Sequence, residues 1–268
     1  MSRSDTRPLS ILTIAGSGGG AGIQADLKTF VAHGVHGLSA IAALTAQDTR
    51  GVTAVHVPPV AFLRAQIDAC FDDFRIGAVK LGMLANTEVI TAVADALEQY
   101  KPSHIVLDPV MVATSGARLL AADALDALRA RLLPLATILT PNIPEAELLL
   151  GHPINDDDAA DAALVELLTL GAPAMLLKGG HLQDSGGMVD RYSDGQTRAE
   201  FAHDRLDVEG HGAGCTLASA LAANLCLGMP SLATCEAATD YVHDALRHAT
   251  RPSRTRVAVL DHFWQLRG

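Results

Sequence analysis

The stretch AVKLGMLANTEVITAVADALEQYKPSHIVLDPVMV, residues 78–112, decides the fold class. Apolar runs typical of buried strands occupy 78–84 and 104–112, and a helical pattern at 88–100 lies between them. A strand, a helix and a second strand in this order favour a parallel pair joined by a helical crossover. Continuously apolar strands of this kind are covered by helices on both faces.

The same alternation continues in both directions. We expect further strands at 9–16, 38–47, 52–57, 136–142 and 174–180, and further helices at 23–34, 60–74, 122–133 and 158–171. Residues 188–206 differ, because two polar-alternating strands meet at Asp194-Gly195, a hairpin signal. The sequence therefore predicts an α/β fold with a doubly wound, mostly parallel sheet, helices on both faces and a small β-hairpin element, in a single domain over residues 1–268.

Composition limits the kinds of partner. The 268 residues carry a formal net charge of −10, which argues against nucleic acid and against an anionic membrane surface as partners. The first ten residues, MSRSDTRPLS, lack the apolar core of a signal peptide, and no later run is long and apolar enough to span a membrane. We therefore expect a cytoplasmic protein with reduced cysteines, in which Cys226 and Cys235 are buried thiols.

Polar and glycine-rich residues follow the ends of the predicted strands. They occur at 16–22, Gln47, Met83, 108–112, 142–145 and 178–181, and in the loop before Cys215. The carboxyl ends of parallel strands meet at one edge of a doubly wound sheet, where ligands bind. The sequence thus predicts a single active site along this edge.

The segment EGHGAGCTLASALAANLCLG, residues 209–228, places Cys215 where a glycine-rich turn becomes a helix. The free backbone N–H groups and partial positive charge of a helix N-terminus suit an anion. The segment therefore predicts an anion site in front of Cys215.

Other motifs have structural as well as functional interpretations. AGSGGGAGIQADLKT (15–29) matches a loose dinucleotide pattern, but the acidic residue expected about 20 positions later is missing, and no GK[ST] closes a Walker A loop. In LTPNIPEAELL (139–149), Asn142 and Glu145 are spaced as a helix capping box, or as groups that face phosphate and hydrated Mg²⁺. Lys178 follows an apolar strand and suits phosphate, whereas Asp108 is either a turn residue or a site residue.

Taken in order, the motifs of this chain resemble those of the hydroxymethylpyrimidine/phosphomethylpyrimidine kinases of thiamine biosynthesis. The matching segments are AGS…GGGAGIQADLKTF, ALTAQDTRGV, KLGML, LDPVMVATSG, LTPNIPEAELL, KGGH and HGAGCT. The resemblance covers about residues 9 to 228. It implies a ribokinase-like fold, a homodimer, and phosphorylation of 4-amino-5-hydroxymethyl-2-methylpyrimidine and then of its monophosphate, with ATP and Mg²⁺.

The resemblance implies catalytic roles around the glycine-rich turn. The backbone N–H groups of Gly212, Ala213, Gly214 and Cys215 would stabilise the transferred phosphoryl group. A Cys215 thiolate favoured by the helix terminus would take the proton of the hydroxymethyl group, with His211 as a relay. In the alternative, Cys215 only packs and the backbone acts alone.

It also implies binding roles. Gln47 should bind the aminopyrimidine ring, and Asp26 should lie beside it. Other residues that resemble the pocket lining of the family are Gly16, Met83 and Val110. The groups expected to serve ATP are Asp108, Asn142 and Lys178, and Glu145 is expected to serve Mg²⁺.

The chain departs from the family pattern in its first loop, where Ser17 meets Gly18 directly and two residues, one of them acidic, are absent. Asp48, Thr114 and Ala213 stand where the family usually has Asn, Lys and Thr. We expect the loop to close nevertheless, because glycine accepts backbone angles closed to other residues. The short loop leaves two alternatives open: a pyridoxal or pyridoxine kinase of the same fold, and a catalytically weak ligand-binding relative.

Overall fold

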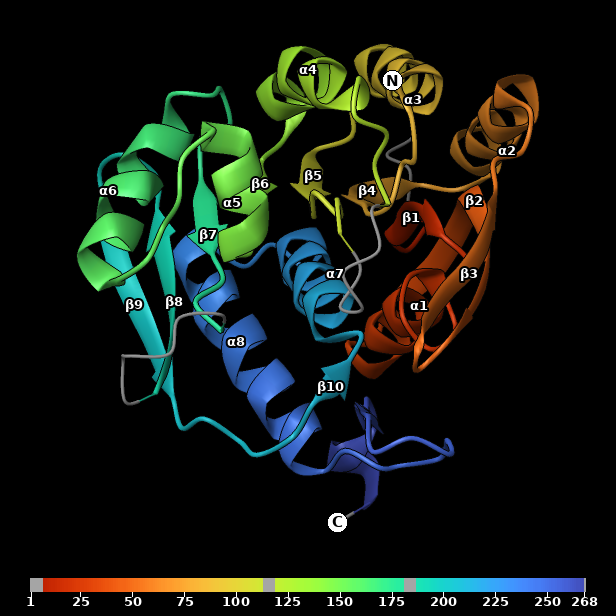
Figure 1. Cartoon of the computed structure of the whole chain (residues 1–268). Coiled ribbons are helices and arrows are strands. Elements are labelled where there is room, and N and C mark those ends of the chain that lie inside the picture. Colours follow the sequence, from red (N-terminus) through yellow and green to blue (C-terminus); the bar gives the residue numbers. More distant parts are fainter. Residues whose placement is uncertain (1–6, 113–118, 181–186, 268) are drawn as a thin grey trace.

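The computed structural model describes residues 7–112, 119–180 and 187–267. A nine-stranded sheet crosses the molecule in the order β3-β2-β1-β4-β5-β6-β7-β8-β9 (Figure 1). Its strands are β1 (Ser10–Gly16), β2 (His36–Asp48), β3 (Gly51–His56), β4 (Ile76–Leu81), β5 (His104–Leu107), β6 (Ile138–Leu139), β7 (Met175–Leu177), β8 (Met188–Ser193) and β9 (Arg198–His203). Pairing is parallel from β2 through β1 and β4 to β7, whereas β3, β8 and β9 pair antiparallel with their neighbours. The predicted mostly parallel sheet is confirmed.

Helices cover both faces of this sheet (Figure 1). They are α1 (Ile23–Ala32), α2 (Val60–Asp73), α3 (Thr87–Tyr100), α4 (Ala124–Ala127), α5 (Ile143–Leu150), α6 (Asp157–Leu168), α7 (Ala213–Cys226) and α8 (Ser231–Arg247). One buried apolar cluster joins α1, α7 and α8 to the sheet, and the other joins α2 to α6 to the opposite face. In β1, the neighbours Ile11 and Leu12 belong to different clusters, because successive side chains of a strand point to opposite faces.

Helix α7 lies at the centre of its layer (Figure 1). Every residue from Thr216 to Cys226 is buried, so its first turn is held rigidly against the sheet. The loop before α7 is held by a second, two-stranded parallel sheet of β10 (Gly210–His211) and β11 (Ala258–Val259). The predicted buried thiols Cys226 and Cys235 are confirmed.

Several predicted boundaries were wrong, for local reasons. Strands β5 and β6 end before Pro109 and Pro141, because proline has no N–H for a sheet ladder. The helix expected at 122–133 divides into α4, a π-helix (Leu128–Leu132) and a 3-10 turn (Leu133–Leu135) that contains Pro134.

The predicted hairpin at Asp194-Gly195 is confirmed, but it is not a separate element. Strand β8 pairs with β7, so the hairpin extends the edge of the main sheet. At its turn Gly195 has φ 83°, and the Asp194 carboxylate accepts the backbone N–H groups of Gln196 and Thr197 at 3.0 and 2.6 Å.

Among the described residues, no helix combines the length and apolar character that a membrane span needs.

Candidate active site

A cavity of about 670 Å³ opens beyond the carboxyl ends of β5, β6 and β7. It is lined by most of the residues that the sequence predicts for the site: Gln47, Asp108, Val110, Asn142, Glu145, Lys178, His211, Gly212, Ala213, Gly214 and Cys215. The ends of β2, β5, β6 and β7 thus meet at one cavity. The chemical roles of these residues remain predictions.

The wall at the ends of β5 to β7 carries a lysine between two carboxylates. Lys178 Nζ lies 2.9 Å from Asp108 Oδ1 and 3.8 Å from Glu145 Oε2. An isolated bridge pairs Asn142 with Lys178, and the Lys178 N–H donates to the Pro141 carbonyl at 2.9 Å. The β6 and β7 ends therefore hold the cation and the carboxylates together.

The two interpretations of the Asn142–Glu145 pair turn out to be compatible. The Asn142 side chain accepts the Glu145 N–H, and the Glu145 carboxylate accepts the Asn142 N–H, both at 2.9 Å, so the capping box is present. Burial, reinforced by Asp108 and opposed by Lys178, raises the pKa of Glu145 to about 7. A buried carboxyl group with such a raised pKa would lose its proton when a cation binds beside it.

The opposite wall is the start of α7. Gly212 precedes the helix with φ 90°, and no side chain caps the helix. The Gly212 carbonyl accepts the N–H and hydroxyl of Thr216 at 3.0 and 2.9 Å. A Cβ on Gly214 would lie 3.3 Å from Lys178 Nζ, so glycine at this position lets the cation approach the helix start. An anion in the cavity would meet both the helix N-terminus and Lys178.

Burial acts against the expected Cys215 thiolate. It raises the pKa of the Cys215 thiol to about 11, against the attraction of Lys80 and a backbone N–H bond from Gly22. The residue is half-buried and borders the cavity, and its catalytic role stays a prediction. Burial also lowers the pKa of His211, whose ring has a backbone hydrogen bond to Gly19 and leaves Nε2 without a partner. Within the described residues no hydrogen bond joins His211 to Cys215.

Asp26 does not lie on the cavity, contrary to the expectation that it lies beside the ring. Its carboxylate has no exposed surface and is 3.0 Å from Lys80 Nζ, which is also fully buried. The hydroxyls of Thr13 and Ser219 donate to it at 2.6 and 2.8 Å. Burial opposes the charge of Lys80, but the attraction of Asp26, Cys215 and Asp108 outweighs it and raises the pKa of Lys80. Asp26 therefore anchors α7, through Ser219, to β1 and β4.

Gly16 and Met83 also lie outside the cavity lining. Met83 is buried with Ala43 and Ala85, and Val110 packs against this group. A Cβ on Gly16 would lie 3.2 Å from Met83 Sδ. The two residues thus support the Val110 side of the cavity from behind.

The short first loop closes as expected, with Gly18, Gly20 and Gly22 at φ 26°, 98° and 54°. A Cβ on Gly19 would lie 2.3 Å from the Gln47 carbonyl, so the loop packs directly on the end of β2. The Gln24 side chain braces it by accepting the Gly20 N–H at 2.9 Å. A register shift between Ala46 and Gln47, a β-bulge, sets the direction of Gln47 at this point.

Two polar residues of the site region were missed from the sequence. Asp190 lines the cavity and accepts the Gly179 N–H at 2.9 Å, which fixes the turn after Lys178. Nothing in the hairpin pattern marks it. Lys80 was marked only by a charge inside the apolar run 78–84. The predicted positions Thr114 and His181 lie outside the described residues.

Comparison with known proteins identifies the family. The model of the phosphomethylpyrimidine kinase family matches residues 16–259. The chain belongs to this family. A hydroxymethylpyrimidine/phosphomethylpyrimidine kinase of Rhizobium meliloti is 48% identical over 244 residues, which cover 90% of this chain and 91% of the relative.

Solved structures of ribokinase-like kinases share the fold. A phosphomethylpyrimidine kinase from Clostridium difficile is 41% identical, with a TM-score of 0.78, over 88% of this chain and 99% of its own. An ADP complex of Bacillus subtilis pyridoxal kinase has a TM-score of 0.89 at 31% identity, over 97% of this chain and 100% of its own. The phosphomethylpyrimidine kinase family thus shares its fold with pyridoxal kinases, while the sequence relatives support the pyrimidine kinase interpretation over the pyridoxal alternative.

Proposed function

We propose that the chain transfers the γ-phosphoryl group of ATP to 4-amino-5-hydroxymethyl-2-methylpyrimidine and then to its monophosphate. The observation that carries the proposal is the pairing of Lys178 with the uncapped start of α7 in one cavity that also exposes Gln47. The first two features suit a nucleotide phosphate, and a primary amide suits an aminopyrimidine edge. The ADP bound to the related pyridoxal kinase supports ATP as the donor.

In the first transfer the hydroxymethyl oxygen attacks the γ-phosphorus, and in the second a phosphate oxygen of the monophosphate does so. In both, the bond to the β-phosphate oxygen breaks and ADP leaves. The backbone N–H groups at 212–215 stabilise the charge on the transferred group, and Lys178 neutralises the phosphates. The hydroxyl proton passes to Cys215. With a thiol pKa of about 11, only the minor thiolate form accepts it.

The donor set fits a magnesium ion shared with the nucleotide. Asp108 and Glu145 both approach Lys178, and carboxylate oxygens are ligands that Mg²⁺ prefers. Mg²⁺ is commonly bound through one or two carboxylates together with substrate phosphates, which Asp108, Glu145 and the nucleotide would supply. When bound, the ion neutralises charge on the phosphates. Asn142 keeps Glu145 in place through the capping box.

We further infer that residues 1–268 act as one ribokinase-like domain in a cytoplasmic homodimer. The support is the family resemblance and the continuity of the nine-stranded sheet.

An ADP-release assay with three acceptors tests the proposal. We expect turnover with hydroxymethylpyrimidine and with its monophosphate, and kcat/KM for both above that for pyridoxal. Lys178→Ala should abolish turnover. The matched control is Lys101→Ala, at the C-cap of α3 and outside the cavity lining, which should keep turnover. Preference for pyridoxal, or full activity of Lys178→Ala, would contradict the assignment.

A further inference from the structure

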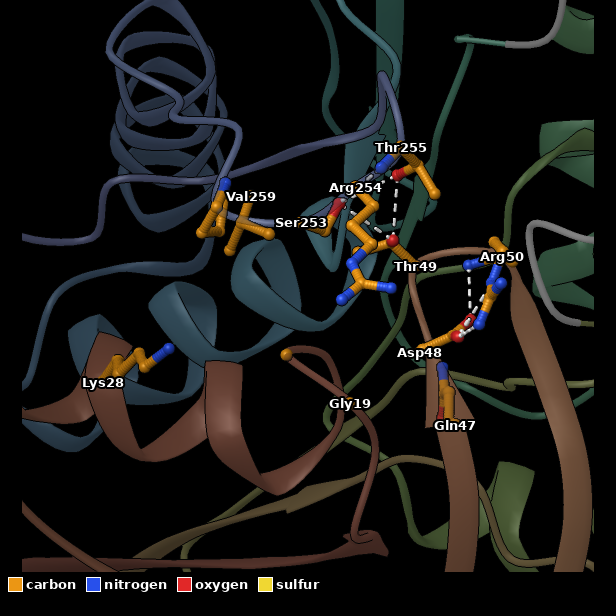
Figure 2. A pocket seen from close by; sticks show the side chains of 12 residues that line it. Gly19, Lys28, Gln47, Asp48, Thr49, Arg50, Ser253, Arg254, Thr255 and Val259 are labelled. Atoms are coloured by element: carbon orange, nitrogen blue, oxygen red, sulfur yellow. Dashed lines mark hydrogen bonds and ion pairs between the residues drawn. The ribbon is translucent and has the colours of Figure 1, made fainter.

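A second cavity, of about 690 Å³, borders the first glycine loop (Figure 2). We call it the basic pocket. Its walls are the first loop with Lys28 of α1, the turn between β2 and β3, and the segment 252–255 with Val259. Gln47, Asp48, Thr49 and Arg50 line both this pocket and the cavity described above. The proposed phosphoryl transfer uses none of the residues that line only the basic pocket.

The wall formed by residues 252–255 is fixed in place. The hydroxyls of Thr49, Ser253 and Thr255 bond one another at 3.1, 2.9 and 2.9 Å (Figure 2). Thr250 and Val259 exchange two backbone hydrogen bonds, at 3.0 and 2.8 Å. Arg254 therefore stands between two anchored neighbours and not on a free tail.

The charge of the basic pocket is opposite to that of the whole protein. Its lining contains Lys28, Arg50, Arg254 and a single acidic residue, Asp48, whereas the chain carries −10. Asp48 is already occupied, because it forms an ion pair with Arg50. Within the described part of the chain, no carboxylate forms an ion pair with Lys28 or Arg254. Two positive charges are left without compensation.

These two side chains extend toward the same space from opposite walls, with Gly19 between them (Figure 2). An anion in this space would meet a lysine and a guanidinium. Because the two cations stand on opposite walls, an anion with two linked phosphates can contact both of them at once. We propose that the basic pocket is a second anion site of this protein and binds a diphosphate group, apart from the anion site at the start of α7.

Isothermal titration of the full chain with inorganic diphosphate tests the proposal. A non-hydrolysable ATP analogue is kept at saturation, so that the cavity at α7 is occupied. We expect one diphosphate per chain, bound more weakly as salt is raised. In Lys28→Ala/Arg254→Ala we expect Kd to increase at least about 30-fold, because two charge-assisted contacts are lost.

The matched control is Arg251→Ala/Arg256→Ala, which removes two exposed arginines of the same segment that do not line the pocket. Its Kd should equal that of the parent. Two results would overturn the proposal: the same Kd for diphosphate in all three proteins, or no heat of diphosphate binding when the ATP analogue is bound. A parallel titration with ADP separates the two sources of a diphosphate group: tighter binding of ADP points to an organic diphosphate, and tighter binding of the inorganic ion to free diphosphate. Failure of the analogue to bind would count against the proposed kinase function alone, since the variants still report on the pocket without it.

Discussion

The raised pKa of the Cys215 thiol leads to a quantitative prediction about pH. A pKa of about 11 means that at pH 7.5 only about one thiol in 3,000 is ionised, and each pH unit multiplies that fraction by about ten. Because the pKa of the thiol is raised, its ionised fraction is small at neutral pH and increases with pH. If the thiolate accepts the proton, kcat should therefore increase about tenfold per pH unit from pH 7 to 10. Cys215→Ala should lower kcat about 10²–10⁴-fold, with little change in substrate affinity.

The measurement is a pH profile of kcat for the parent, Cys215→Ala and Cys215→Asp. In Cys215→Asp, kcat should depend much less on pH, because an aspartic acid side chain has a pKa of about 3.9 and is already ionised over this range. Cys70→Ala, a half-buried cysteine on α2, controls for loss of any thiol. A parent profile that is flat, or Cys215→Ala with near-normal kcat, would leave catalysis to the backbone N–H groups and Lys178.

Four further predictions concern single features of the site. Gln47→Ala should weaken binding of hydroxymethylpyrimidine by roughly 1–3 kcal/mol, measured by calorimetry, because ring donors or acceptors lose their partner; unchanged affinity would refute the pocket assignment. Lys80→Met should lower the free energy of unfolding by about 3–5 kcal/mol in urea titrations, because it leaves Asp26 buried and unpaired, and Lys80→Met/Asp26→Leu should recover most of the loss; equal stability of the two variants would refute this. Glu145→Gln should raise the Mg²⁺ concentration for half-maximal activity about tenfold or more, and an unshifted magnesium titration would remove Glu145 from the metal site. Insertion of Asp-Ser after Ser17 should raise kcat/KM for hydroxymethylpyrimidine more than for pyridoxine, since a longer loop adds a carboxylate and cover; an equal effect on both would contradict the role of the loop.

The fold could be predicted from the sequence because the parallel strands β1 and β4 to β7 are buried on both faces. Adjacent residues such as Ile11 and Leu12 belong to different apolar clusters. Because both faces of such a strand must be apolar, its sequence is an unbroken apolar run. Strand lengths could not be predicted from apolarity alone, since Pro109 and Pro141 interrupt pairing while apolar residues continue beyond them. The antiparallel edge was only partly visible, because a hairpin turn does not reveal which neighbour its strands will pair with.

The site residues were predictable where the chain geometry alone places them. Asp108 follows β5 and Lys178 follows β7, on either side of β6, so the sheet order brings them to the same edge, where they lie 2.9 Å apart. The predicted position of Asp26 beside the ring was wrong because its partner, Lys80, lies 54 residues away in the sequence. The ion pair between the two holds the Asp26 carboxylate inside the core. The Cys215 pKa could not be read from the helix terminus, since burial by surrounding layers decides it.

The short first loop links these observations. Gly19 lies against the Gln47 carbonyl, Gly20 lies beside the His211 ring, and Gly212 packs on the carbonyl of Gly20. A Cβ would clash at Gly19 and fit tightly at Gly212, and the φ of 98° at Gly20 favours glycine there, so these glycines let one loop touch both the expected ring-binding residue and the anion loop. Gly19 and Gly20 also form a wall of the basic pocket. Residues 19–20 therefore border the basic pocket on one side and contact Gln47 and Gly212, which line the other cavity.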